Sequence, residues 1–73
     1  MQYVLRLWLP STISDTWQWR VYSGQSHYIG TLFYNRISER VTHNVRDQSF
    51  NKAFCDKNLT TKIENEQEEI VYA

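Results

Sequence analysis

Apolar and polar residues alternate along much of the first half of the chain, which is the pattern of half-buried β-strands. Between residues 16 and 22 the odd positions are apolar and the even positions are mixed, with Trp17, Trp19 and Val21 alternating with Gln18, Arg20 and Tyr22. Ser23 to Ser26 has the composition of a turn, in which Gly24 can take a positive φ angle. Residues 27–34 return as a second strand, so residues 15–34 are predicted to form a β-hairpin.

The turn of this hairpin fixes which residues face each other. A two-residue and a four-residue turn give the same register, in which Val21 faces Tyr28, Trp19 faces Gly30 and Trp17 faces Leu32. A large indole opposite a glycine is a favourable cross-strand pair, because the ring covers the bare backbone. The second face of the hairpin is then mixed and is expected either to be covered by a helix or to bind a partner. Its members are Gln18, Arg20, Tyr22, His27, Ile29, Thr31 and Phe33.

Residues 2–9 alternate in the same way and are predicted to form a first strand. One face carries Tyr3, Leu5, Leu7 and Leu9, and the other carries Val4, Arg6 and Trp8. Pro10 ends this strand, because proline has no N–H to donate to a sheet ladder. Short connections favour pairing between sequential strands, so residues 2–34 are predicted to form a three-stranded antiparallel meander.

The pattern changes after the hairpin, where Ile37, Val41 and Val45 recur every four residues. On a helix this spacing places the three side chains on one stripe and turns Glu39 away from it, so residues 36–46 are predicted to be helical. The β-branched residues of this segment favour a strand instead. The alternative fold is therefore a small all-β barrel with one short helix, in which residues 36–46 form a fourth strand.

The last third of the chain has weaker signals. Phe50, Ala53 and Phe54 would lie nearly opposite the first apolar stripe on one continuous helix, so a break is expected at residues 47–49. A second short helix is predicted from Ser49 to about Lys57, with Asn58 as its C-terminal stop. The remaining segments are compatible with a strand at residues 59–64, a solvated turn or tail at 64–69 and a short terminal strand at 70–72.

The predicted fold class is therefore α+β. It consists of a three-stranded antiparallel β-meander, one or two short helices packed on one face, and a short C-terminal strand. A chain of 73 residues is expected to form a single small domain, 1–73. Its three tryptophans, five tyrosines and three phenylalanines are a high aromatic content, which supplies buried area to a small core or anchors to a binding surface.

Charge is unevenly distributed although the formal net charge is zero. Residues 1–46 hold all five arginines against Asp15 and Glu39, whereas residues 47–73 hold three lysines against six acidic residues. Cys55 is the single cysteine, and neither a signal-peptide pattern nor an apolar run of about 20 residues is present. These features predict a cytoplasmic protein without a membrane partner.

No catalytic or cofactor motif can be recognised. The two glycines lie in the hairpin and do not form a phosphate-binding loop. His27, His43 and Cys55 are the soft metal-ligand candidates, and they lack the spacing of a metal site. We therefore expect no catalytic residues, no metal site and no cofactor, and we expect the protein not to be an enzyme.

The favoured function is a non-enzymatic protein-binding module. We expect a small stoichiometric regulator or inhibitor of a larger complex, such as one that processes nucleic acid, because Trp, Tyr and Arg are typical interface anchors. The candidate contact residues are Trp8, Arg20, Tyr22 and Phe33 on the mixed sheet face, with Glu66, Glu68 and Glu69 supplying negative charge.

Two alternatives remain. Aromatics interleaved with arginines on an open sheet can stack on bases and neutralise phosphates, which would make Arg6, Trp8, Arg20 and Tyr22 a single-stranded nucleic-acid site. The second alternative is a self-associating accessory subunit, in which a sheet edge such as Met1 to Leu9 or Ile70 to Tyr72 pairs across a two-fold axis of a homodimer.

Overall fold

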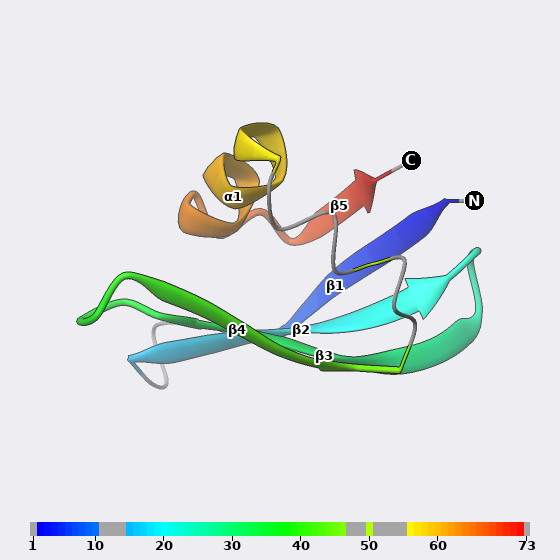
Figure 1. Cartoon of the computed structure of the whole chain (residues 1–73), viewed down its shortest axis with the longest axis horizontal. Coiled ribbons are helices and arrows are strands. Elements are labelled where there is room, and N and C mark those ends of the chain that lie inside the picture. Colours follow the sequence, from blue (N-terminus) through cyan, green and yellow to red (C-terminus); the bar gives the residue numbers. More distant parts are fainter. Residues whose placement is uncertain (1, 11–14, 47–49, 51–55, 73) are drawn as a thin grey trace.

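The computed structural model describes residues 2–10, 15–46, 50 and 56–72. These residues form a five-stranded antiparallel sheet with one helix on one of its faces (Figure 1). The strands lie in the spatial order β4-β3-β2-β1-β5, and the sheet is not closed. The elements in chain order are β1 (Tyr3–Leu9), β2 (Thr16–Ser23), β3 (His27–Asn35), β4 (Arg40–Val45), α1 (Lys57–Glu64) and β5 (Glu69–Tyr72).

The predicted antiparallel meander of the first three strands is confirmed, and so is the short C-terminal strand. β5 pairs with β1, so the two ends of the chain run side by side in Figure 1. The expectation that residues 1–9 offer a free edge for dimer formation is therefore wrong, because β1 is an interior strand with β2 on one side and β5 on the other. The edge strands are β4 and β5.

The register of the β2–β3 hairpin differs from the predicted one. Ser23 pairs with His27 around a three-residue turn, and Tyr22 pairs with Tyr28. A β-bulge follows, because Val21 pairs with Gly30 and leaves Ile29 as an extra residue on β3. The turn and the bulge together shift the pairing by two residues. Accordingly Trp19 faces Leu32 and Trp17 faces Tyr34, and neither indole faces Gly30.

The helix predicted at residues 36–46 is wrong, because residues 40–45 form β4 against β3. A spacing of four is compatible with a strand as well as a helix, since Val41 and Val45 both point to the same face of the sheet. The turn before β4 is held by the Asn35 side chain, whose Oδ1 accepts hydrogen bonds from the backbone N–H groups of Ile37 (2.9 Å) and Ser38 (3.1 Å). The barrel alternative correctly included a fourth strand after the hairpin. The sheet does not close into a barrel, however, because β4 and β5 lie at opposite edges.

Residues 59–64, which the sequence allowed to be a strand, belong to the helix α1. Asp56 caps α1 by accepting a hydrogen bond of 2.8 Å from the backbone N–H of Asn58, which lies within the helix and does not stop it. Leu59 and Ile63, one turn apart, are its buried residues. The predicted helix from Ser49 to Lys57 falls largely outside the described residues.

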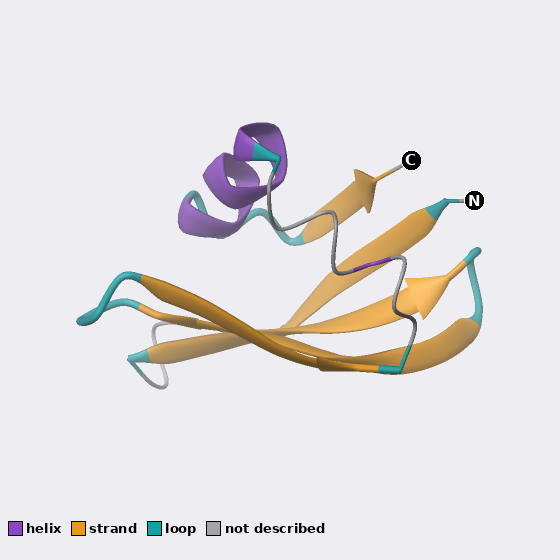
Figure 2. Ribbon diagram, in the orientation of Figure 1, coloured by secondary structure: helices purple, strands orange, loops and turns teal. Residues whose placement is uncertain are grey.

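The hydrophobic core lies between α1 and one face of the sheet, which we call the inner face (Figure 2). Leu59 and Ile63 of the helix pack with Trp19 and Leu32 of the central strands, and all four side chains are almost completely buried. Phe50 joins this core, with its ring centre 5.0 Å from that of Tyr3 in an edge-on arrangement. The helix expected on one face is therefore found on the side of Trp17 and Trp19, and no described element covers the opposite side.

Candidate functional site

The sheet face opposite α1, which we call the outer face, gathers the candidate residues from the strands. Alternation along each strand turns every second side chain to this face. The first two strands contribute Val4, Arg6 and Trp8 from β1 and Gln18, Arg20 and Tyr22 from β2. The remaining strands contribute Tyr28, Thr31 and Phe33 from β3, Arg40, Thr42 and Asn44 from β4, and Glu69 and Val71 from β5.

Arg6 lies between an aromatic ring and a carboxylate. Its guanidinium carbon is 4.9 Å from the centre of the Tyr22 ring, a cation–π distance. Its Nε is 3.5 Å from Oε2 of Glu69, the neighbouring residue on β5. Its Nη2 also donates a long hydrogen bond of 3.5 Å to the backbone carbonyl of Gln25 in the hairpin turn. Arg6 is thus held in place on the surface while its side chain remains about half exposed.

Arg20 lies directly opposite Arg6 on the neighbouring strand. Like charges at such a position destabilise a sheet. The Arg20 guanidinium carbon is 5.0 Å from the centre of the Trp8 ring, which gives this arginine its own aromatic partner. A β-bulge between Leu7 and Leu9 makes Trp8 an extra residue of β1 and places its ring next to Arg20. Two cations are therefore kept side by side, each against a ring.

The aromatic rings of the outer face are accessible. Trp8 is 47% exposed and Tyr28 is 52% exposed, although most large side chains of the sheet are buried. The rings of Tyr22 and Tyr28 meet edge to face with their centres 5.8 Å apart. The Tyr28 hydroxyl also forms a hydrogen bond of 2.9 Å with Oγ1 of Thr31. Aromatic rings and guanidinium groups therefore lie next to each other across the middle of the outer face.

The five described strands contain a single acidic residue, Glu69. The strands also contain three arginines, Arg6, Arg20 and Arg40, and Arg46 follows directly after β4. The other acidic residues of the described chain belong to α1 or to connecting segments: Asp15, Glu39, Asp56, Glu64, Glu66 and Glu68. The zero net charge therefore arises from a sheet with excess positive charge and a remainder with excess negative charge.

The acidic residues near the C-terminus have different backbone environments, although Glu68 and Glu69 line the same pocket. Glu66 has a φ angle of 57° and ends α1, where its N–H donates to the carbonyl of Ile63 in a Schellman turn. Glu68 accepts a hydrogen bond of 2.8 Å from the N–H of Leu7 through its backbone carbonyl. Glu69 is on β5 and pairs with Arg6. The three glutamates expected to act together thus occupy three different structural positions.

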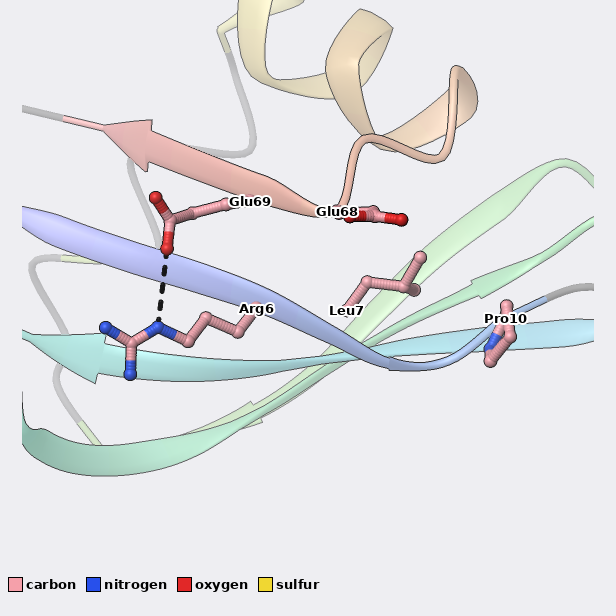
Figure 3. A pocket seen from close by; sticks show the side chains of 5 residues that line it. All are labelled: Arg6, Leu7, Pro10, Glu68 and Glu69. Carbon is pink, nitrogen blue, oxygen red and sulfur yellow. Dashed lines mark ion pairs between the residues drawn. The ribbon is translucent and has the colours of Figure 1, made fainter.

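Glu68 and Glu69 line a pocket at the beginning of β5 (Figure 3). The pocket has a volume of about 410 Å³ and its other lining residues are Arg6, Leu7 and Pro10. Figure 3 shows Arg6 and Glu69 pointing toward one another from neighbouring strands. With two carboxylates and one arginine among its five lining residues, the lining has an excess of negative charge, so the interior of this pocket is poorly suited to an anion.

Reasoning from the sequence placed Arg6 with Trp8, and Trp8 with Arg20, Tyr22 and Phe33, and the structure places all five on the outer face. Ile29 was assigned to the same mixed face, and it is instead buried in the core. Other residues of this face were missed, namely Tyr28, Arg40 and Arg46. Tyr28 was assigned to the apolar face because the bulge was not foreseen. Arg40 and Arg46 were assigned to a helix, although the polar residues at positions 40, 42, 44 and 46 are the alternation of a strand.

Within the described residues, no three His, Cys, Asp or Glu side chains lie close enough together to hold a metal ion. The helix of the described chain has eight residues, and it has neither the length nor the apolar character needed to cross a membrane. The outer face presents guanidinium groups and aromatic rings to a ligand. No protein-family model matches the chain, and neither a curated protein nor a solved structure shows significant similarity to it.

Proposed function

We propose that the protein binds single-stranded nucleic acid on the outer face of its sheet and acts by stoichiometric binding rather than by catalysis. The observation that carries the proposal is the cross-strand pair of Arg6 and Arg20, each held against an aromatic ring. Two cations placed directly opposite each other cost stability. Glu69 offsets part of this cost at Arg6, whereas the structure gives Arg20 an aromatic ring as its partner. An anionic ligand that contacts both arginines offsets the remainder, and phosphates along a nucleic-acid strand are such a ligand.

The rings beside these arginines fit the same ligand. Single-strand binding sites combine cations that follow the backbone with aromatic side chains on which bases stack, each stacked base contributing about 1–3 kcal/mol. Trp8 and Tyr28 present exposed rings on opposite sides of the arginine pair, from β1 and β3. Neighbouring strands are about 4.8 Å apart, so the five strands offer a surface about 19 Å wide, enough for several nucleotides.

The zero net charge of the chain does not argue against this ligand. Electrostatic attraction depends on the potential near the binding surface more than on the total charge, and exposed charges farther away than about 8–10 Å are largely screened at physiological salt. The acidic residues outside the sheet lie on α1 and on the connecting segments, where Glu68 is beside Arg6 and Glu39 directly precedes Arg40. A duplex fits less well, because its bases are stacked inside a helix and are not available to rings on a sheet face.

The proposal is tested by fluorescence anisotropy with labelled single strands of DNA and RNA of about 12 nucleotides, a length within the range of small binding domains. We expect saturable binding to single strands that is at least about tenfold tighter than binding to a duplex of the same sequence. If about three phosphates are neutralised, the logarithm of the affinity falls with the logarithm of the salt concentration with a slope of about −2.

The matched variants are Arg6→Gln and Arg36→Gln. Arg6 is on the outer face, whereas Arg36 is an exposed residue of the turn between β3 and β4. We expect Arg6→Gln to reduce the salt slope by about 0.7, the contribution of one phosphate contact to a single strand, and Arg36→Gln to leave it unchanged. Equal binding of single strands and duplex, or equal effects of the two variants, would contradict the proposal.

A second candidate is a protein partner, for which the chain would serve as a small non-enzymatic regulator or inhibitor. The observation that favours it is the exposure of Trp8, Tyr28 and Val71 on one face, since aromatic and arginine side chains are the usual anchors of protein interfaces. A tagged pull-down with and without nuclease separates the two candidates. A defined protein that is recovered equally after nuclease treatment favours the regulator, and recovery that is lost with nuclease favours nucleic acid.

A further inference from the structure

A second pocket lies at the end of the outer face next to the turn between β3 and β4. This turn is at the left of Figure 1. We call the pocket the turn pocket. Its volume is about 330 Å³, within the usual range of small-ligand sites. The lining residues come from β2, β3, β4 and the intervening turn, and they are Thr16, Phe33, Asn35, Ser38, Arg40 and Thr42.

The lining of the turn pocket combines one aromatic ring, one cation and several neutral polar side chains. Phe33 supplies a flat apolar surface and is flanked by Gln18 on β2 and Thr42 on β4. Arg40 supplies the positive charge. Among the lining residues there is no carboxylate, in contrast to the pocket of Arg6, Glu68 and Glu69. The chemistry of the turn pocket therefore suits a ligand that has both a planar apolar part and an anionic part.

The turn fixes the polar rim of this pocket. Oδ1 of Asn35 accepts hydrogen bonds from the N–H groups of Ile37 and Ser38, so the amide is locked in one orientation and its Nδ2 is a donor at a fixed place. Asn35 and Arg40 are also paired residues of β3 and β4, which places them directly opposite each other at the end of the ladder. A rim held by such local hydrogen bonds is preorganised for a ligand.

We propose that the turn pocket binds one nucleotide of the strand, with the base against Phe33 and the phosphate at Arg40. This inference rests on the proposed function, because it names a specific nucleotide site within the outer face. A guanidinium group is the most favourable side chain for a phosphate, with which it forms paired charge-assisted hydrogen bonds. The aromatic ring and the phosphate-binding group are then separate parts of one pocket, so both halves of a nucleotide are recognised together.

The test uses nucleoside monophosphates, the matching nucleosides and inorganic phosphate, each titrated against the whole chain and followed by two-dimensional NMR. We expect the monophosphate to shift the amide signals of residues 33–42 and to bind at least about tenfold more tightly than the nucleoside, the effect of one charge-assisted hydrogen bond. Arg40→Gln removes this preference for the phosphate, and Arg36→Gln, a change of the same kind in the adjacent turn, preserves it. Phe33→Leu keeps an apolar side chain but removes the stacking surface, and weakens nucleoside and monophosphate alike.

The inference is overturned if nucleoside and monophosphate bind equally, if inorganic phosphate binds as tightly as the monophosphate, or if the shifted signals lie elsewhere in the chain. Oligonucleotide binding separates it from the proposed function. If single strands bind wild type and Arg40→Gln with the same affinity, the turn pocket is not a nucleotide site although the outer face is. If monophosphates bind at the turn pocket but single strands do not bind, the proposed function fails and the pocket stands as a site for free nucleotides.

Discussion

The Trp19 indole Nε1 donates a hydrogen bond of 2.9 Å to the backbone carbonyl of Gln67, 48 residues later in the chain. Trp19 is completely buried on the central strand β2, and Gln67 belongs to the turn that connects α1 to β5. The bond therefore fixes the return of the chain from the helix to the sheet, and with it the position of Glu69 beside Arg6 on the outer face.

The first prediction compares Trp19 with Trp17. The Trp17 Nε1 is also buried, but it has no hydrogen-bond partner among the described residues, and its ring is stacked on Tyr34 at 5.0 Å. Trp19→Phe leaves the Gln67 carbonyl without its donor and removes core volume, so we expect a loss of about 2–4 kcal/mol in the free energy of unfolding. Trp17→Phe removes an unpaired donor together with the volume and should cost about 1–2 kcal/mol. Urea denaturation measures both, and an equal or larger cost at Trp17 would contradict this account.

The second prediction concerns Gly30, where β4 approaches β3 closely. A Cβ built at Gly30 would lie 2.1 Å from the backbone oxygen of Asn44 and 2.7 Å from Cα of Val45. Gly30→Ala therefore forces β4 away from β3 and should cost about 3 kcal/mol or more, since backbone atoms cannot give way as side chains do. Hydrogen exchange should show the loss at the amides of β4 before those of β1 and β2.

Gly24→Ala is the control for this change. Gly24 has a φ angle of 68°, and an added Cβ there would meet no atom within 4 Å. Its cost should be limited to the strain of the backbone conformation, about 1 kcal/mol. If the two alanine variants are equally destabilised, the close approach of β4 is not what requires a glycine at position 30.

The third prediction concerns the turn that precedes β4, where Glu39 has a φ angle of 56°. This conformation is unfavourable for residues with a side chain and is readily adopted by glycine. Glu39→Gly should therefore raise the free energy of unfolding by about 0.5–1 kcal/mol. Arg36→Gly, in the same turn but without a positive φ angle, should lower it by a similar amount because the unfolded chain gains entropy. Thermal unfolding of the two variants gives the sign in each case.

The fourth prediction is a loss of stability at alkaline pH. Burial raises the pKa of Tyr34 above its ordinary value of 10.0, and the negative charges of Glu64 and Glu39 raise it further. The unfolded chain therefore releases the Tyr34 hydroxyl proton at a lower pH than the folded protein does. The contribution of Tyr34 to the free energy of unfolding is complete below about pH 10 and is lost as the pH rises above that value. The decrease should be smaller in Tyr34→Phe and in Glu64→Gln. Urea midpoints at pH 7 and above pH 10 measure it, and identical decreases in wild type and Tyr34→Phe would contradict the assignment.

The alternation of apolar residues was sufficient to predict β1, β2 and β3. The terminal strand β5 was only compatible with the sequence, because residues 70–72 are all apolar and do not alternate. Alternation could not predict the register of the hairpin. The bulge at Ile29 depends on how β3 packs, and neither of the two turn lengths considered gives the pairing of Ser23 with His27. Val41 and Val45 fit both periods, so the choice between helix and strand for residues 40–45 required the pairing partner that β3 provides.

The helix α1 had a local signal that was not used. Asp56 is a favourable N-cap residue, and Leu59 and Ile63 have the spacing of one helical turn. For the candidate site, alternation placed Arg6 with Trp8 on one strand face and Arg20 with Tyr22 on another. It could not show that Arg6 and Arg20 are directly opposite each other, because that relationship depends on the pairing of β1 with β2 and not on either strand alone.

The last prediction is that Arg20→Glu strongly weakens ligand binding with little change in stability. The substitution removes the cation–π contact with Trp8, worth about 0.5–1 kcal/mol at an exposed site. It also replaces the like-charge pair of Arg6 and Arg20 with an opposite-charge pair, worth about 0.2–1 kcal/mol in the other direction. The thermal midpoint should therefore change by only a few degrees, whereas a carboxylate in the centre of the outer face should weaken binding of a single strand by more than about tenfold.

Arg36→Glu is the matched control, because it makes the same change of charge in the exposed turn between β3 and β4. We expect it to weaken binding by less than about threefold at physiological salt, where screening limits the reach of a surface charge. Anisotropy titrations and thermal melts of the two variants decide the matter together. A large drop in the midpoint of Arg20→Glu would make Arg20 a structural residue, since the sheet would then depend on its contact with Trp8. Equal weakening by both variants would show that binding responds only to net charge, and the cross-strand arginine pair would then have no special role.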